Sequence, residues 1–244
     1  MGNLRQYYGK VAQNAQGHGS SAAGPTNPIT QAKSIGYSEK ELQTVPEGSV
    51  MGMGCGNPTT LAKLQEGQTV LDLGCGGGLD VFLAALRVGK NGHVIGIDMT
   101  QEMLDRAKAN ATKGDYKNVE FLLGNMENMP VKDNSIDVVI SNCVINHALD
   151  KVRAFREALR CLKPGGRLLV SDLVVQGEFS DDTLQDEVWG AWIANALERR
   201  EYLNAIEVAG FKNITIVTEN LFNLSEADDR LKGKISSISV EAYK

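Results

Sequence analysis

One short stretch constrains the fold of this chain more than any other. It reads Val70-Leu71-Asp72-Leu73-Gly74-Cys75-Gly76-Gly77-Gly78-Leu79-Asp80. Its apolar start predicts a buried strand, and its alternate glycines allow a tight turn with bare backbone amides. A predicted helix over residues 81–88 follows, and then a second apolar run, 94–97, that ends in Asp98. Strand, glycine loop, helix, strand and acid together predict a βαβ unit that binds a nucleotide-like ligand through its ribose.

Two ligand classes fit this unit, a dinucleotide such as NAD and S-adenosylmethionine (SAM). A dinucleotide site favours the spacing Gly-x-Gly-x-x-Gly for its pyrophosphate. Here the spacing is Asp-x-Gly-x-Gly-x-Gly, which resembles motif I of class I SAM-dependent methyltransferases and makes SAM the favoured cofactor. We expect Asp72, Gly74, Gly76 and Gly78 to surround its methionine part, where glycine amides can serve the carboxylate. The alternative role for Asp72 is to cap the glycine turn.

The remaining apolar runs predict an α/β fold of the Rossmann-like, seven-stranded class I methyltransferase type. Its sheet is expected to be mostly parallel, with a terminal antiparallel strand and an N-terminal extension. Further strands are predicted at 119–123, 136–140, 167–172, 214–218 and 235–242. Further helices are predicted at 100–113, 150–162, 183–197 and 200–209. We expect an N-terminal extension over 1–66, which includes a short helix near Tyr7 and a lid-like loop over 13–28, and a SAM-binding domain over 67–244.

Ligands of open α/β folds lie at the carboxyl edge of the sheet, so residues that follow the strands are candidate contacts. The candidates for the ribose, the adenine and the methyl side are Asp98, Met99, Asn125, Met126 and Asn142.

Composition excludes several other classes of function. The chain of 244 residues has a net charge of −5 and a pI of about 5.3, so a nucleic-acid partner is not expected. No apolar run approaches the ~20 residues of a membrane helix, and the N-terminus lacks the apolar core of a signal peptide. We therefore expect a cytoplasmic protein with a small-molecule substrate, and the sequence leaves the oligomeric state open.

Four cysteines occur, and none pairs with another as Cys-x-x-Cys, so a structural zinc site is not expected. Cys55 lies between Gly54 and Gly56, which we expect to leave its thiol reachable. Cys143 follows the predicted fourth strand. Cys75, in the glycine loop, and Cys161, on an amphipathic helix, are interpreted as structural.

Several motifs together are more specific than the glycine loop. They are Tyr7-Tyr8-Gly9, Val45-Pro46-Glu47-Gly48, Gly54-Cys55-Gly56-Asn57-Pro58, Gly92–Thr100, Ser141-Asn142-Cys143-Val144-Ile145-Asn146, Trp189-Gly190 and Glu201-Tyr202-Leu203. With them the chain resembles the arsenite methyltransferases, a SAM-dependent family that methylates trivalent arsenic.

The resemblance implies roles for three residues. Cys55 and Cys143 match two arsenic-binding, and hence catalytic, cysteines of the family, and Tyr7 matches a tyrosine motif that closes over the cofactor. The alternative for the tyrosines is an N-terminal helix that packs aromatic rings. Trivalent arsenic is soft and binds thiolates. Its lone pair attacks the SAM methyl group without loss of a proton, so catalysis needs positioning rather than a base.

The sequence also departs from the family pattern. The family usually has a third cysteine where this chain has Trp192. Two thiols can still hold arsenic that carries a methyl group or a small thiol such as glutathione. The alternatives are another small methyl acceptor, or a SAM-binding module without catalysis. Trp189 and Trp192 are interpreted as core or as a wall that replaces the lost thiol. His147, where the family often has Leu, is expected to be a solvated loop histidine rather than a ligand.

Overall fold

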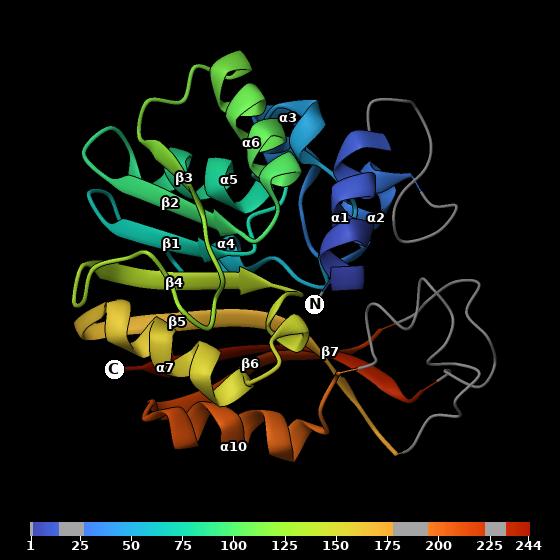
Figure 1. Cartoon of the computed structure of the whole chain (residues 1–244), viewed down its shortest axis with the longest axis vertical. Helices are drawn as coiled ribbons and strands as arrows, with labels where there is room; N and C mark the ends of the chain where they lie inside the picture. Colours follow the sequence, from blue (N-terminus) through green and yellow to red (C-terminus); the bar gives the residue numbers. More distant parts are fainter. Residues whose placement is uncertain (1, 15–26, 178–194, 223–232) are drawn as a thin grey trace.

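The computed structural model describes residues 2–14, 27–177, 195–222 and 233–244, which are built around a seven-stranded sheet (Figure 1). The strand order is β3-β2-β1-β4-β5-β7-β6. The first five strands pair in parallel, and β7 lies antiparallel between β5 and β6. The strands are β1 Thr69–Leu73, β2 His93–Asp98, β3 Val119–Leu123, β4 Ile136–Asn142, β5 Leu162–Val175, β6 Lys212–Leu221 and β7 Ile235–Tyr243. The predicted Rossmann-like, mostly parallel sheet with a terminal antiparallel strand is confirmed.

Helices cover both faces of the sheet, as parallel strands require. One face packs against α2, α3, α5 and α6, and the other against α7 and α10, which lie side by side (Figure 1). The helices are α1 Gly2–Asn14, α2 Pro28–Ser34, α3 Glu39–Thr44, α4 Pro58–Leu61, α5 Leu79–Val88, α6 Gln101–Lys113, α7 Lys151–Cys161 and α10 Arg199–Ala209. The described residues also contain two 3-10 turns, η1 Glu47–Ser49 and η2 Ile145–His147.

The apolar runs of the central strands are continuous because both of their faces are buried. Val70 packs on the α5 side and its neighbour Leu71 on the α7 side, and both are fully buried. The same alternation applies to Val138 and Val139 in β4. Successive side chains of a strand point to opposite faces, so only a two-sided sheet explains these runs.

The N-terminal region contains more helix than the sequence predicted. α1 extends well beyond the short helix expected near Tyr7, and α2 begins at Pro28, where a loop was expected to end. Residues 15–26 of that loop lie outside the described part of the chain. α3 begins with a capping box, in which Ser38 and Glu41 exchange hydrogen bonds.

Two other differences lie at the ends of predicted elements. The helix expected over 183–197 falls mostly on residues that the structure does not describe, and these include Trp189 and Trp192. Its last three residues, 195–197, are described and are not helical. β5 is longer than predicted, because it starts at Leu162 and continues past Asp172 to Val175. Pairing with β7 as well as β4 supports this length.

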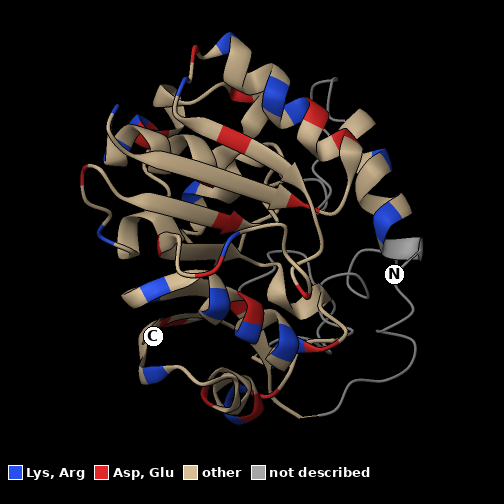
Figure 2. Ribbon diagram, turned by 60° about the vertical axis from the view of Figure 1, so that its left-hand side comes forward, with Lys and Arg blue, Asp and Glu red and all other residues tan. Residues whose placement is uncertain are grey.

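Charge follows the layers of the fold. In Figure 2 most of the blue and red segments lie on the outer helices. The strands carry few charged residues, and two of their red segments lie at the arrowheads that mark strand ends. Within the described residues no helix has the length and apolar character needed to cross a membrane. The acidic strand ends direct attention to the carboxyl edge of the sheet.

Candidate active site

A cavity of about 480 Å³ lies at the carboxyl ends of β1, β2 and β4. Its wall includes residues from the glycine loop, from the ends of β2 and β4, and from α1. Parallel α/β sheets bind their ligands at this edge, where strand ends and helix N-termini meet. The cavity is therefore the candidate ligand site of this fold.

The glycine loop passes under the cavity in a conformation that side chains would prevent. Gly74 has a φ of +71°, and a Cβ atom there would overlap the side chain of Val144. The amide of Gly76 donates a hydrogen bond to the Asp98 carboxylate, 3.0 Å away, which joins the loop to the end of β2. Gly78 then caps α5. Of these three glycines, Gly74 and Gly76 lie in the cavity wall.

Asp72 is the clearest sign of a cationic ligand. Its side chain lines the cavity at 2% exposure, and among the described residues no group donates a hydrogen bond to it. Burial, followed by the nearby charges of Asp80 and Asp98, raises the pKa of Asp72 well above its usual value. A buried carboxylate without a donor is costly unless a cation pairs with it. The ammonium of SAM is a cation of the required kind, so the site fits this cofactor.

The residues expected to hold the nucleoside part also gather at the cavity. Asp98 and Met99 at the end of β2, and Asn125 and Met126 after β3, all lie in its wall. Asp98 also accepts bonds from the Thr100 amide and hydroxyl at 2.9 and 2.8 Å, which fix the carboxylate at the cavity edge.

The loop before α4 carries Cys55 and is clamped against the ends of β4 and β5. The Asn142 side chain accepts from the amide of Cys55 at 3.0 Å and donates to the carbonyl of Gly56 at 2.8 Å. A Cβ atom at Gly56 would lie 2.6 Å from the hydroxyl oxygen of Ser171. The expectation that the flanking glycines expose the thiol is wrong: Cys55 is only 3% exposed. The glycines instead allow the close approach that buries it.

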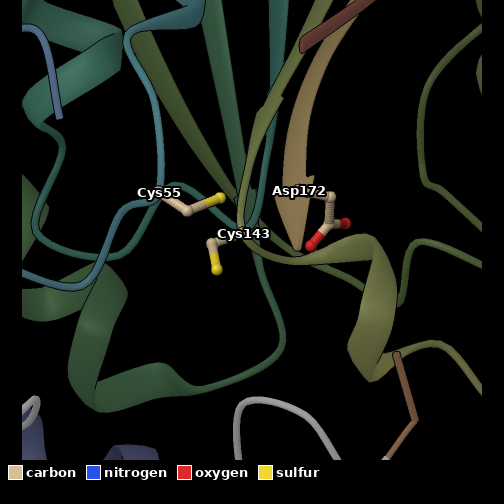
Figure 3. A group of neighbouring side chains, drawn as sticks. All are labelled: Cys55, Cys143 and Asp172. Atoms are coloured by element: carbon tan, nitrogen blue, oxygen red, sulfur yellow. The ribbon is translucent and has the colours of Figure 1, made fainter. Parts of the chain in front are cut away.

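Cys143 lies immediately beyond the end of β4, and the fold brings it next to Cys55 (Figure 3). Its φ of +61° is unusual for a residue with a side chain, and its amide donates to the Ser171 carbonyl at 2.8 Å. Cys143 lines the cavity, whereas Cys55 lies behind it and is absent from the wall. The sulfur of Cys143 is therefore accessible from the cavity, and the sulfur of Cys55 lies next to it on the side away from the cavity.

The two thiols affect each other's ionisation. Burial and the hydrogen bond to Cys143 raise the pKa of Cys55 well above its usual value. The pKa of Cys143 is lowered by that same bond, yet burial and the charge of Asp172 leave it raised overall. Both groups are therefore thiols, not thiolates, at neutral pH in the free protein.

Asp172 of β5 completes this cluster, although it lies outside the sequence motifs described above. One carboxylate oxygen of Asp172 and the two sulfurs all lie within 4.8 Å of one another (Figure 3). Asp172 is fully buried, and burial raises its pKa to about 7. Asp172 is the last residue of the strand predicted over 167–172. Its place at a strand end, on the same edge of the sheet as Cys143, is the sequence signal that could have identified it.

The N-terminal helix α1 contributes one wall of the cavity. The Tyr8 hydroxyl and His147 Nε2 share a hydrogen bond of 2.9 Å, and their rings meet edge to face. Tyr8 lines the cavity, whereas Tyr7 packs edge to face on Tyr8 and is absent from the wall. His147 is half-buried in the cavity wall rather than a freely solvated loop histidine, and burial lowers its pKa to about 4.

The comparisons with known proteins agree with this geometry. A family model described as a methyltransferase domain matches residues 64–210. An arsenite methyltransferase of Halobacterium salinarum is 39% identical over 97% of this chain and 61% of its own length. The solved structure of an arsenic(III) S-adenosylmethionine methyltransferase from Chlamydomonas reinhardtii is 30% identical, with a TM-score of 0.70 over 90% of this chain and 74% of that one. The chain belongs to the arsenite methyltransferase family.

A second relative, the arsenite methyltransferase of Aquipseudomonas alcaligenes, is 36% identical over 92% of this chain and 66% of its own length. The chain thus spans 61% and 66% of the length of these two members of the family. The mostly parallel seven-stranded sheet with its antiparallel terminal strands is the fold of class I SAM-dependent methyltransferases.

The other two cysteines have structural positions. Cys161 is fully buried in the core between the sheet, α7 and α10, as predicted. Cys75 packs in the core on the opposite face and also reaches the cavity wall. The position where the family usually has its third cysteine, Trp192, lies outside the described residues.

Proposed function

We propose that this protein transfers a methyl group from SAM to trivalent arsenic held by Cys55 and Cys143. The observation that carries the proposal is the pair of adjacent buried sulfurs, of which that of Cys143 lines the cofactor-type cavity. Membership of the arsenite methyltransferase family supports it. SAM supplies an electrophilic methyl group on a sulfonium sulfur.

We propose that the cofactor is held by the residues that the glycine loop and strand ends bring to the cavity. Asp72 pairs with the ammonium. The amides of Gly74, Gly76 and Gly78 already donate hydrogen bonds within the protein, so these glycines serve the cofactor through the shape of the loop. Asp98 accepts from the ribose hydroxyls, while Asn125 and Met126 bound the adenine. Asn142 positions the thiol loop through its bonds to Cys55 and Gly56.

The arsenical is proposed to reach Cys143 first, because this thiol lines the cavity. Each thiol replaces one hydroxide on arsenic: a sulfur–arsenic bond forms, an arsenic–oxygen bond breaks, and the thiol proton leaves with the hydroxide as water. Arsenic binding therefore needs no ionised cysteine in the free protein. Once two sulfurs hold it, arsenic keeps a third substituent, which is a hydroxide, a methyl group or a small thiol.

We also propose that the chain consists of two parts with different roles. Residues 1–66 form an extension that carries the cysteine loop and the tyrosines, and 67–244 form the SAM-binding domain. The methyltransferase-domain model begins at residue 64, which supports this boundary.

The test is titration with arsenite and methylarsenite in the presence of SAM, followed by analysis of the arsenic products. Fluorescence of the two tryptophans reports binding. We expect near-stoichiometric binding and methylated arsenic with the unmodified protein, loss of both with Cys143→Ser, and little change with Cys161→Ala, which alters a core cysteine. Methyl transfer to a different small acceptor, or SAM that remains intact with every arsenical, would contradict the proposal.

A further inference from the structure

Asp172 is a buried acid to which the proposed reaction has so far given no role. It stands within 4.8 Å of both sulfurs, on the side of the cluster formed by β5 (Figure 3). Its exposed fraction is zero. A fully buried carboxylate costs free energy, so its position next to a reactive pair requires an explanation.

Four donors hold this carboxylate in one orientation. Oδ1 accepts from the Asn146 side chain at 2.8 Å and from the Leu173 amide at 3.0 Å. Oδ2 accepts from the Asn146 amide and from the Tyr202 hydroxyl, both at 3.2 Å. With both oxygens occupied, Asp172 is poorly suited to act as a direct arsenic ligand. It is well suited to act as a fixed negative charge.

Methyl transfer to arsenic moves a positive charge. The arsenic lone pair forms the arsenic–carbon bond, and the electron pair of the carbon–sulfur bond returns to the donor sulfur. The sulfur becomes a neutral thioether, and the arsenic acquires the formal positive charge. A fixed anion beside the acceptor therefore stabilises the transition state more than the reactants.

We propose that Asp172 is the counter-charge for the cationic arsenic centre that methyl transfer produces. This inference rests on the proposed function and adds one residue to it. Both sulfurs lie within 4.8 Å of one carboxylate oxygen of Asp172. An arsenic atom bound to both sulfurs is therefore close to this carboxylate as well.

The first experiment compares Asp172→Asn with the unmodified protein at pH 8, where the native carboxyl is ionised. The dissociation constant of methylarsenite is measured by fluorescence, and the rate of methyl transfer by single turnover at saturating arsenical and SAM. Removal of a unit charge at this range lowers the rate about 10²- to 10³-fold, by analogy with the loss of one preorganised electrostatic contact. The dissociation constant should change less than about threefold, because both thiols remain.

A second readout does not depend on turnover. The charge of Asp172 raises the pKa of both cysteines. Asp172→Asn should therefore speed alkylation of Cys143 by iodoacetamide at pH 8 by about threefold or more, measured site by site with mass spectrometry. A purely structural role for Asp172 predicts no such change in a correctly folded variant.

Tyr202→Phe is the matched control, since it removes one donor to the carboxylate and keeps the charge. We expect a rate loss below about tenfold. If Asp172→Asn does not accumulate as folded protein, Asp172→Ser provides a second neutral replacement.

Each outcome has a clear meaning. Unchanged single-turnover rate in a folded neutral variant overturns the inference, and so does a tenfold weaker dissociation constant with an unchanged rate, which would make Asp172 a ligand. If the unmodified protein does not methylate arsenic at all, the proposed function fails instead.

Discussion

Asp72→Asn should make the protein without its cofactor more stable and make it bind SAM less well. The native carboxylate is 2% exposed, receives no hydrogen bond from any described residue, and lies near the acidic Asp80 and Asp98. An amide of the same shape removes the charge and adds no bulk. The gain comes from removal of a buried charge that Asp80 and Asp98 repel. At roughly 1 kcal/mol for each neighbouring acid, we expect a gain of about 2 kcal/mol in the free energy of unfolding. For a chain of this size, that raises Tm by about 4–8 °C.

The sign of the pH dependence follows from the raised pKa of Asp72. The folded protein holds this proton more tightly than the unfolded chain, whose aspartate pKa is about 3.9. The stability of the native protein therefore falls as pH rises from about 4 through the folded pKa. The advantage of Asp72→Asn should be small at pH 4.5 and larger at pH 8.

Cofactor binding should reduce the stability advantage of Asp72→Asn over the native protein. Loss of a charged hydrogen bond costs about 1.5–3 kcal/mol, which weakens SAM binding roughly 10- to 100-fold. Thermal unfolding with and without SAM, together with calorimetric titration, measures both effects. At a SAM concentration that saturates the native protein, the Tm of the variant should rise less than that of the native protein.

Asp137→Asn is the matched control at the opposite end of the sheet. Asp137 accepts from the Thr69 amide at 2.8 Å and pairs with Lys163 at 2.8 Å, so the same chemical change should lower Tm by up to a few degrees. If Asp72→Asn instead lowers the Tm of the cofactor-free protein and leaves SAM affinity intact, Asp72 is a structural cap of the glycine turn and our reasoning is refuted.

Three further predictions test other parts of the site. Gly56→Ala places a Cβ 2.6 Å from the Ser171 hydroxyl oxygen, so it should cost about 1–3 kcal/mol and weaken arsenical binding more than SAM binding in parallel titrations. Tyr8→Phe removes the hydrogen bond to His147 and should weaken SAM binding less than about tenfold; a larger loss with unchanged stability would show direct contact with the cofactor. The pKa of His147 is about 4 when folded and about 6.5 when unfolded, so the free energy of unfolding falls as pH drops from 6.5 to 4. Urea unfolding should show a loss of about 3 kcal/mol that His147→Gln removes.

The local pattern of the sequence was sufficient to predict the fold. The glycine loop, the acid after β2 and the two-sided apolar strands each depend on residues close together in the chain. The capping box of α3 is likewise a property of four consecutive residues. These features follow from backbone geometry and periodicity, which short segments already specify.

The tertiary structure decided what surrounds each reactive group. Cys55 was expected to be reachable because of its glycines, but the loop folds onto Asn142 and Ser171 and is buried. His147 was expected in solvent, but Tyr8 of α1 hydrogen-bonds to its ring and the side chain is half-buried. Both errors have the same cause, since a neighbour distant in sequence sets the solvation of the side chain.

The sequence by itself therefore determined the class of fold, the place of the cofactor-type cavity and the two candidate sulfurs. Only the packed structure set Cys55 beside Cys143, left Asp72 without a donor, and brought Asp172 within 4.8 Å of both sulfurs. Periodicity reports which face of an element is apolar. Distances between residues on different elements, and the ionisation that depends on them, arise only when the sheet and its loops assemble.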